Sequence, residues 1–148
     1  MLRWKKSAGL LTALVVCAVS LAACRHRPDE VQVREAIAAV ATAAEAGAAS
    51  DVVAPLSDDF DGNAGELDRR SLGNLIRLFA LRGEHVGVTL GPIGIEHRGT
   101  RMVATFTVTL TSGSHLLPDQ LGLYRVESAW RNEEGKWRCY TASWTHAM

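Results

Sequence analysis

Three aspartates close together in the chain are the acidic residues best placed for chemistry. Asp58 and Asp59 are neighbours, and Asp61 lies two positions further on, directly before Gly62. A carboxylate held in apolar surroundings can act as a general base towards a small molecule. Asp58 and Asp59 could supply such a base, and whether they do depends on the fold that positions them. The alternative interpretation is that these carboxylates only solvate a turn.

A histidine in a predicted loop is the third catalytic candidate. His115 follows Ser114 in a segment rich in small and polar residues. The pair is adjacent in sequence and matches no serine-nucleophile motif such as Gly-x-Ser-x-Gly. The pair is therefore not a catalytic triad, and His115 alone remains a catalytic candidate.

The sequence predicts no metal site and no cofactor. Residues 59–63 begin like a calcium loop, but Ala64 occupies the glycine position and Arg70 stands where a bidentate glutamate is needed. No glycine-rich phosphate loop is present. The histidines include no pair at i, i+4 spacing and no His-Glu-x-x-His motif; they are His26, His85, His97, His115 and His146.

Aromatic residues concentrate near the C-terminus and supply the ligand-binding candidates, Tyr124 and Trp130. These two share strand parity, so we expect them on one face of a sheet. Tyr140 and Trp144 also share a parity, which is opposite to that of Trp137. The aromatic rings either line a concave ligand surface or pack the core and a sheet-to-sheet contact.

The N-terminus has the pattern of a bacterial export signal. Three basic residues lie within the first six positions, and residues 8–21 are uncharged and mostly apolar. That stretch is too short to span a bilayer. Ala22 and Ala23 precede Cys24, which resembles the lipobox of bacterial lipoproteins. We therefore expect residues 1–23 to be a signal peptide and Cys24 to be acylated; an ordinary signal peptide or an uncleaved anchor is the alternative.

This resemblance implies a protein held at the cell envelope. Residues 24–28 would form a short tether from the acyl chains in the bilayer to the folded domain. Arg25 follows the cysteine, where an aspartate would resemble an inner-membrane retention signal. We therefore expect the outer membrane, with the domain facing the periplasm.

The net charge bears on the partners that the protein can bind, and the cysteine content bears on its disulfides. Residues 1–23 hold three of the 16 basic residues and none of the 16 acidic ones, so the remainder has a net charge of −3. This balance gives no electrostatic case for a nucleic-acid partner. Cys139 is the only cysteine after Cys24, so no internal disulfide forms in an acylated chain, and we expect a buried, unreactive thiol.

Two amphipathic helices are predicted in the first half of the domain. The first begins at Asp29, and its apolar stripe is Val33, Ile37, Val40, Ala44 and Ala48. A short helix is expected over residues 52–56, before a short strand or loop. The second long helix begins near Asp68 and stops at Gly83. Its stripe is Leu72, Leu75, Ile76 and Phe79.

The second half changes to the two-residue period of strands. A proline and two glycines interrupt the first run and indicate a bend or bulge. A turn at residues 133–136 joins the last two strands into a hairpin. The predicted strands cover residues 85–90, 95–97, 101–111, 121–131 and 137–144.

This order of elements resembles the nuclear transport factor 2-like (SnoaL-like) superfamily. The resemblance rests on the alanine-rich opening helix, the aspartate segment 56–62, the arginine-rich helix ending at Gly83 and the hairpin 130–137, within residues 29–148. It implies an α+β fold in which helices pack in the concavity of a strongly curved antiparallel sheet. The resulting cone has a pocket at its open end, and members often dimerise through the sheet.

The resemblance leaves three functions open, because one fold serves many activities. The first is an envelope lipoprotein whose cone binds a small ligand or protein partner without catalysis. The second is an isomerase- or dehydratase-type enzyme with Asp58 or Asp59 as base, although the tyrosine expected in the first helix is missing. The third is a structural module that forms a homodimer through its sheet.

Overall fold

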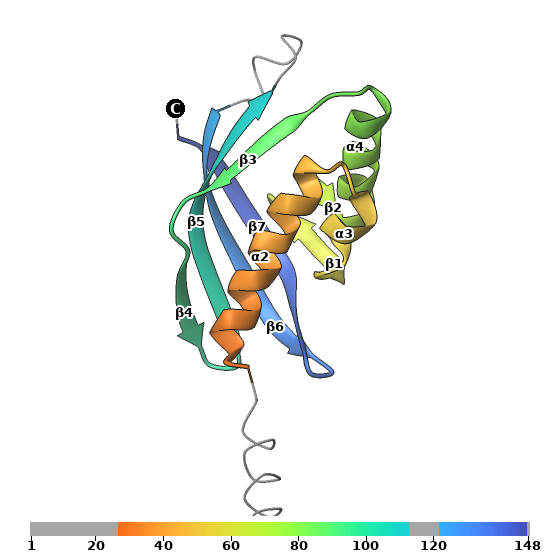
Figure 1. The fold of residues 1–148 in the computed structure, drawn as a ribbon. Coiled ribbons are helices and arrows are strands. Elements are labelled where there is room, and N and C mark those ends of the chain that lie inside the picture. Colours follow the sequence, from red (N-terminus) through yellow and green to blue (C-terminus); the bar gives the residue numbers. More distant parts are fainter. Residues whose placement is uncertain (1–26, 113–121, 148) are drawn as a thin grey trace, which may run out of the picture.

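A computed structural model describes residues 27–112 and 122–147, which form one layer of helices against one curved sheet (Figure 1). The helices are α2 (Asp29–Glu45), α3 (Ala49–Val53) and α4 (Arg69–Leu81). The strands are β1 (Leu56–Gly62), β2 (Leu67–Asp68), β3 (Val86–Leu90), β4 (Gly94–Arg98), β5 (Arg101–Ser112), β6 (Gly122–Glu133) and β7 (Lys136–His146).

The seven strands form a single mixed sheet. Its order is β2-β1-β7-β6-β5-β3, with β4 also paired to β5 beyond the end of β3. All pairings are antiparallel except that of β1 with β7, which is parallel. The α+β prediction is thus confirmed, but the sheet is not antiparallel throughout. The difference arises because α4 and the β3–β6 meander intervene between β1 and β7, so the chain returns to β1 in the same direction.

Local chemistry explains the ends of α4. The Asp68 carboxylate accepts a hydrogen bond from the backbone N–H of Ser71 at 2.7 Å, which caps the first turn. At the other end, Gly83 adopts a φ of 66°, in the left-handed region that glycine tolerates. The predicted start and stop of this helix are both confirmed.

The short helix lies three residues earlier than expected. Gly47, with a φ of 67°, turns the chain out of α2, and the Ala48 carbonyl then accepts the first hydrogen bonds of α3. α3 ends at Val53, and Ala54 keeps helical φ and ψ; Pro55, which has no backbone N–H, then prevents the hydrogen-bonded turns from continuing. The expected range of 52–56 is wrong because Ser50 and Asp51, which resemble cap residues, lie inside α3, and Ala48 precedes its first turn.

The first predicted run of strand is interrupted at the expected place. Residues 91–93 separate β3 from β4, and both strands pair with β5, which is long enough to serve the two. The hairpin between β6 and β7 turns through Glu134 and Gly135, both with positive φ, as a type I′ turn requires. Residues 113–121, which include His115, lie outside the described part of the chain.

A bulge in β7 changes which aromatic residues share a face. Trp130 pairs with Cys139, but its neighbour Ala129 pairs with Thr141, so one extra residue, Tyr140, is inserted. As a result, Trp144 faces the helices while Tyr140 lies on the opposite face of the sheet. The expectation that these two rings share a face is wrong, because a bulge shifts the two-residue period by one.

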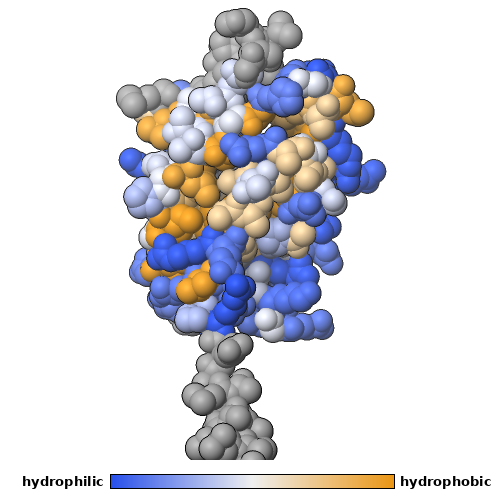
Figure 2. Space-filling model, in the orientation of Figure 1, coloured by the Kyte–Doolittle hydropathy of each residue, from blue (hydrophilic) through white to orange (hydrophobic). Residues whose placement is uncertain are grey.

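The core lies between α2 and the concave face of the sheet. Val33 and Met102 have no solvent exposure, and Trp130 is 2 % exposed. The buried cluster is Val33, Ile37, Leu56, Phe60, Met102, Ala104, Trp130 and Cys139. Figure 2 shows pale, weakly apolar surface across the middle of the molecule, where the alanine-rich α2 crosses the sheet.

Candidate functional site

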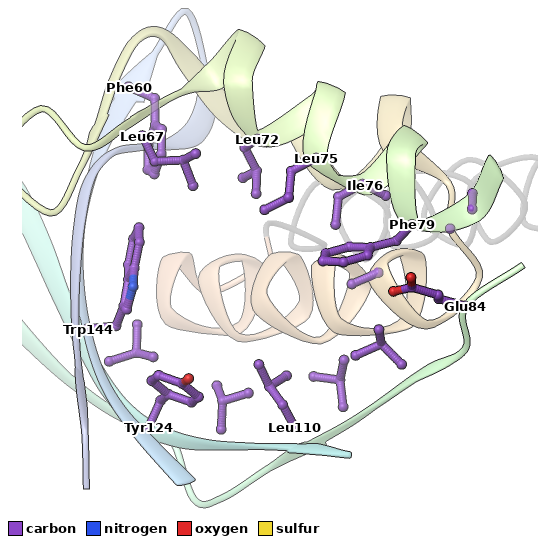
Figure 3. A pocket seen from close by; sticks show the side chains of 17 residues that line it. Phe60, Leu67, Leu72, Leu75, Ile76, Phe79, Glu84, Leu110, Tyr124 and Trp144 are labelled. Carbon is purple, nitrogen blue, oxygen red and sulfur yellow. The ribbon is translucent and has the colours of Figure 1, made fainter. Parts of the chain in front are cut away.

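An apolar cavity of about 430 Å³ lies beside the core, at the end of α2 farther from the N-terminus. One wall is α4, and the other is the concave face of β3, β5, β6 and β7 (Figure 3). Leu75 lines it and is 38 % exposed, so the cavity reaches the surface at α4. The lining is Ala44, Gly47, Phe60, Leu67, Leu72, Leu75, Ile76, Phe79, Ala80, Glu84, Val86, Val88, Val108, Leu110, Tyr124, Val126 and Trp144.

A second cavity of about 250 Å³ adjoins the first towards the core. Seven residues, among them Phe60, Leu72 and Trp144, line both. The inner cavity reaches Trp130 and Cys139, whereas the outer one reaches Tyr124. Together they form an apolar space that runs from the surface at α4 to the buried cluster.

Strand and helix periods together produce this lining. The even-numbered residues of β5, among them Phe106, Val108 and Leu110, face the cavity as their alternation predicts. The predicted apolar stripe of α4 faces it from the other side (Figure 3). A stripe that normally closes onto a sheet is held away from it here, and the volume between them is the cavity.

Tyr124 lies at the wall of the cavity, as expected for a ligand-binding candidate. Its ring packs edge-on against His146, with ring centroids 5.0 Å apart. Figure 3 shows the Tyr124 hydroxyl directed into the cavity, on the side formed by β6. The other candidate, Trp130, lies deeper, and its indole N–H donates to the Ser128 hydroxyl at 2.9 Å. Trp130 is therefore part of the core and the floor of the inner cavity.

Glu84 is a site residue that the sequence analysis missed. Among the residues that the structure describes, it is the only one with a carboxylate in the lining of the outer cavity, and it lies near Phe79 in Figure 3. Its position in the sequence could have identified it, because it directly follows the predicted helix stop Gly83, where the residue frequently makes an apolar contact with the last turn. A glutamate at that position is unusual.

The aspartate candidates lie elsewhere. Both Asp58 and Asp59 are exposed, and neither lines the apolar cavity. Asp59 accepts a hydrogen bond from the Arg131 guanidinium at 2.6 Å. Asp58 borders a polar surface depression with Arg69 and Glu133. The apolar surroundings that would make either one a base towards a ligand in the cavity are absent from these positions.

Arg131 links Asp59 to a second carboxylate at the end of the hairpin. Its Nε donates to Glu133 at 2.8 Å, and the buried Ser57 hydroxyl donates to the same carboxylate. The Ser57 hydrogen bond and then the Arg131 guanidinium hold the pKa of Glu133 below its usual value. The Arg131 guanidinium also lies 5.1 Å from the centre of the Tyr140 ring. This network ties β1 to the hairpin and is structural.

Cys139 is a buried thiol, as expected from the sequence. It is 3 % exposed and donates weakly to the Thr141 carbonyl at 3.3 Å. Burial raises the pKa of Cys139 to about 12, so the thiolate is scarce at neutral pH. These surroundings do not suit a catalytic nucleophile.

The outer face of the sheet is polar where β5 pairs with β6. Thr105 lies opposite Glu127, and Thr107 lies opposite Arg125, on the side away from the cavity. An apolar outer face would favour association through the sheet. These cross-strand pairs do not provide one.

Residues 27–112 and 122–147 also bear on a metal site and on a membrane-spanning helix. Within these ranges, no three histidine, cysteine, aspartate or glutamate side chains gather closely enough to hold a metal ion. Among the helices of the same ranges, none has the length and apolar character needed to cross a membrane. Cys24 and the rest of the predicted signal lie outside them.

Solved structures provide the comparison for this architecture. An NTF2-like protein from Cytophaga hutchinsonii matches with a TM-score of 0.64 and 15 % identity, over 81 % of this chain and 99 % of that one. An NTF2-like protein with a cystatin-like fold from Novosphingobium aromaticivorans matches with a TM-score of 0.65 and 20 % identity, over 93 % and 90 %. The domain has the nuclear transport factor 2-like fold.

A third NTF2-like protein, of unknown function and from Pseudomonas putida, matches with a TM-score of 0.63 and 16 % identity, over 78 % of this chain and 84 % of that one. No known family model matches the sequence. No curated protein matches it either. The NTF2-like fold is therefore established for this domain, and its activity must be argued from its own cavity.

Proposed function

We propose that this domain binds a small, largely apolar molecule in the cavity between α4 and the sheet. The observation that carries the proposal is the lining itself. Of the 17 described residues that line the cavity, 15 are apolar, tryptophan or glycine, and the other two are Glu84 and Tyr124. A volume of about 430 Å³ lies within the range of small-molecule sites, which are concave and mostly apolar with few polar groups. A core without a ligand would normally be packed to a higher density.

We further propose that the chain is a lipoprotein anchored through Cys24. The support is the sequence pattern at residues 21–24, and the tether that follows is short. The helix α2 begins at Asp29, and at 1.5 Å per residue its 17 residues extend about 25 Å. The cavity borders Ala44 and Gly47, at the far end of this helix. The anchored domain would therefore hold its cavity away from the bilayer and take its ligand from the aqueous side, the periplasm.

Ligand binding is a better-supported function than a reaction in which Asp58 or Asp59 acts as the base. An isomerase or dehydratase needs its base within hydrogen-bond reach of the substrate. These two aspartates are exposed and separate from the cavity, and Asp59 is engaged by Arg131. Association through the sheet receives no support from its polar outer face.

The binding proposal is tested by blocking the cavity. Val108 lines both cavities, so Val108→Trp fills the space where they meet. Val31→Trp is the matched control, because Val31 is 38 % exposed on α2 and lines neither. Calorimetric titration of the full chain with 2-methylnaphthalene should give equal affinity for the wild type and Val31→Trp, and at least about tenfold weaker binding for Val108→Trp. Equal binding to Val108→Trp would contradict the proposal, and so would a wild type that binds neither 2-methylnaphthalene nor its derivatives with a polar group.

The anchor is tested separately. Intact mass spectrometry of the protein from its own membranes should give residues 24–148 plus acyl chains. A Cys24→Ser variant should remain unprocessed and unacylated. An unmodified full-length mass, or cleavage at another residue, would overturn the lipoprotein proposal.

A further inference from the structure

The backbone of Glu84 is fixed by the end of α4. The N–H of Glu84 donates to the Phe79 carbonyl, and the N–H of Gly83 donates to the Ala80 carbonyl, each at 3.1 Å. These two bonds, with the positive φ of Gly83, constitute a Schellman motif. The residue after the glycine therefore has a defined position, next to the last turn of the helix.

That position directs the Glu84 side chain towards the apolar cavity. In a Schellman motif this residue frequently makes an apolar contact with the third residue from the helix end, which is Phe79 here. Figure 3 shows the Glu84 carboxyl beside the Phe79 ring, at the opposite end of the cavity from Trp144. A carboxyl group thus occupies the position of an apolar contact.

One oxygen of this carboxyl is buried without a partner. Glu84 Oε2 is shielded from solvent and accepts no hydrogen bond within the described part of the chain. A buried carboxylate oxygen without a hydrogen bond is strongly unfavourable, whereas leucine or phenylalanine would be compatible with the surrounding residues. A donor supplied from the cavity would satisfy this oxygen.

We propose that Glu84 is the polar anchor of the cavity and selects ligands that carry a hydrogen-bond donor, an ammonium or a hydroxyl group, on an apolar body. This inference rests on the proposed function, since it assigns the ligand class of the same cavity. The apolar lining holds the body of the ligand, and the donor group meets Glu84 Oε2. A ligand with a carboxylate in that place is rejected, because two like charges would face each other in apolar surroundings.

The test uses four probes that differ only in one group. These are 2-naphthylmethylamine, 2-naphthylmethanol, 2-methylnaphthalene and 2-naphthoate, titrated calorimetrically into the full chain in phosphatidylcholine nanodiscs, with empty nanodiscs as the blank. The wild type should bind the amine and the alcohol at least about tenfold more tightly than 2-naphthoate, because a hydrogen bond to a charged group is strong when buried.

Two variants separate the role of the carboxylate from the shape of the cavity. Glu84→Leu should bind 2-methylnaphthalene at least as well as the wild type while losing the preference for the amine and the alcohol over 2-naphthoate. Glu84→Gln should lose the preference for the amine and retain part of that for the alcohol, because its amide oxygen still accepts a hydrogen bond. The matched control is Glu127→Gln, which removes the same charge from the outer face of β6 and should behave as the wild type.

The outcomes distinguish the two proposals. If the wild type binds 2-methylnaphthalene but does not discriminate among the head groups, or if Glu84→Leu and Glu84→Gln keep the wild-type preference, the role of Glu84 is overturned and the binding function stands. If the wild type binds none of the four probes, the proposed binding function itself fails. Retained binding of 2-methylnaphthalene by Glu84→Leu shows that this variant is folded.

Discussion

Enlarging a residue in the cavity wall tests whether the volume beside α4 is empty space in the folded protein. Val126 lies on β6, faces the outer cavity and is only partly buried. Val126→Leu adds one methylene group there. Burial of one methylene stabilises a protein by about 0.8 kcal/mol, so the free energy of unfolding should rise by up to this amount.

The same substitution in the packed core should have the opposite sign. Val33 on α2 has no solvent exposure and belongs to the buried cluster. An extra methylene in a well-packed core forces its neighbours to move and costs about 1–3 kcal/mol. Val33→Leu therefore serves as the matched control, since the chemical change is identical and only the free volume around it differs.

Urea unfolding followed by tryptophan fluorescence measures both effects, on protein refolded from urea to remove any bound ligand. With a slope of about 2 kcal/mol/M, Val126→Leu should raise the unfolding midpoint by up to roughly 0.4 M, and Val33→Leu should lower it by roughly 0.5 M or more. Equal destabilisation by Val126→Leu and Val33→Leu would contradict this prediction. Side chains would then occupy the volume in solution.

Three further predictions concern the surroundings of the cavity. Because burial raises the pKa of Cys139 to about 12, iodoacetamide at pH 8 should leave this thiol unmodified in the folded protein and label it in urea, as read by peptide mass spectrometry. The Ser57 hydroxyl and the Arg131 guanidinium lower the pKa of Glu133, so its stabilising contribution is present at neutral pH and is lost as the pH falls below about 4.5. Glu133→Gln should therefore flatten the acid part of the stability profile, and an unchanged profile would contradict this assignment. A methyl group at Gly62 would lie 2.8 Å from an indole ring that lines the cavity and 2.9 Å from a backbone oxygen, so Gly62→Ala should lower the stability by about 1–3 kcal/mol in thermal unfolding, and a neutral result would refute the contact.

Much of the fold could be predicted because its signals are local. The stripe of α4, its N-cap at Asp68 and its stop at Gly83 all follow from side-chain chemistry within a few residues. The bend between β3 and β4 follows from Pro92 and its flanking glycines. The clean alternation of β5 correctly identified the residues that face the helices.

The predictions from sequence fail where the structure depends on contacts between residues that are far apart in the sequence. The parallel pairing of β1 with β7 has no local signature, because it depends on how the chain returns after α4. The bulge at Tyr140 reverses the strand parity through a mismatch with β6 that periodicity alone does not reveal.

The candidate site was predicted only in part, for the same reason. Tyr124 was correctly placed at the cavity wall, whereas Trp130 belongs to the core beneath it. Asp58 and Asp59 form a cluster in the sequence, but a cluster in sequence does not determine which face of β1 its members occupy. Glu84 stands alone in the sequence, and only the volume between α4 and the sheet gives it a role.

Mass spectrometry under non-denaturing conditions, on the protein extracted from its own membranes, would show whether the cavity holds a ligand. Wild type and Val108→Trp should be compared. The wild type should carry a small-molecule adduct that is released on denaturation and is missing from Val108→Trp. A wild type without any adduct, or the same adduct on both proteins, would contradict the claim that the cavity between α4 and the sheet is a ligand-binding site.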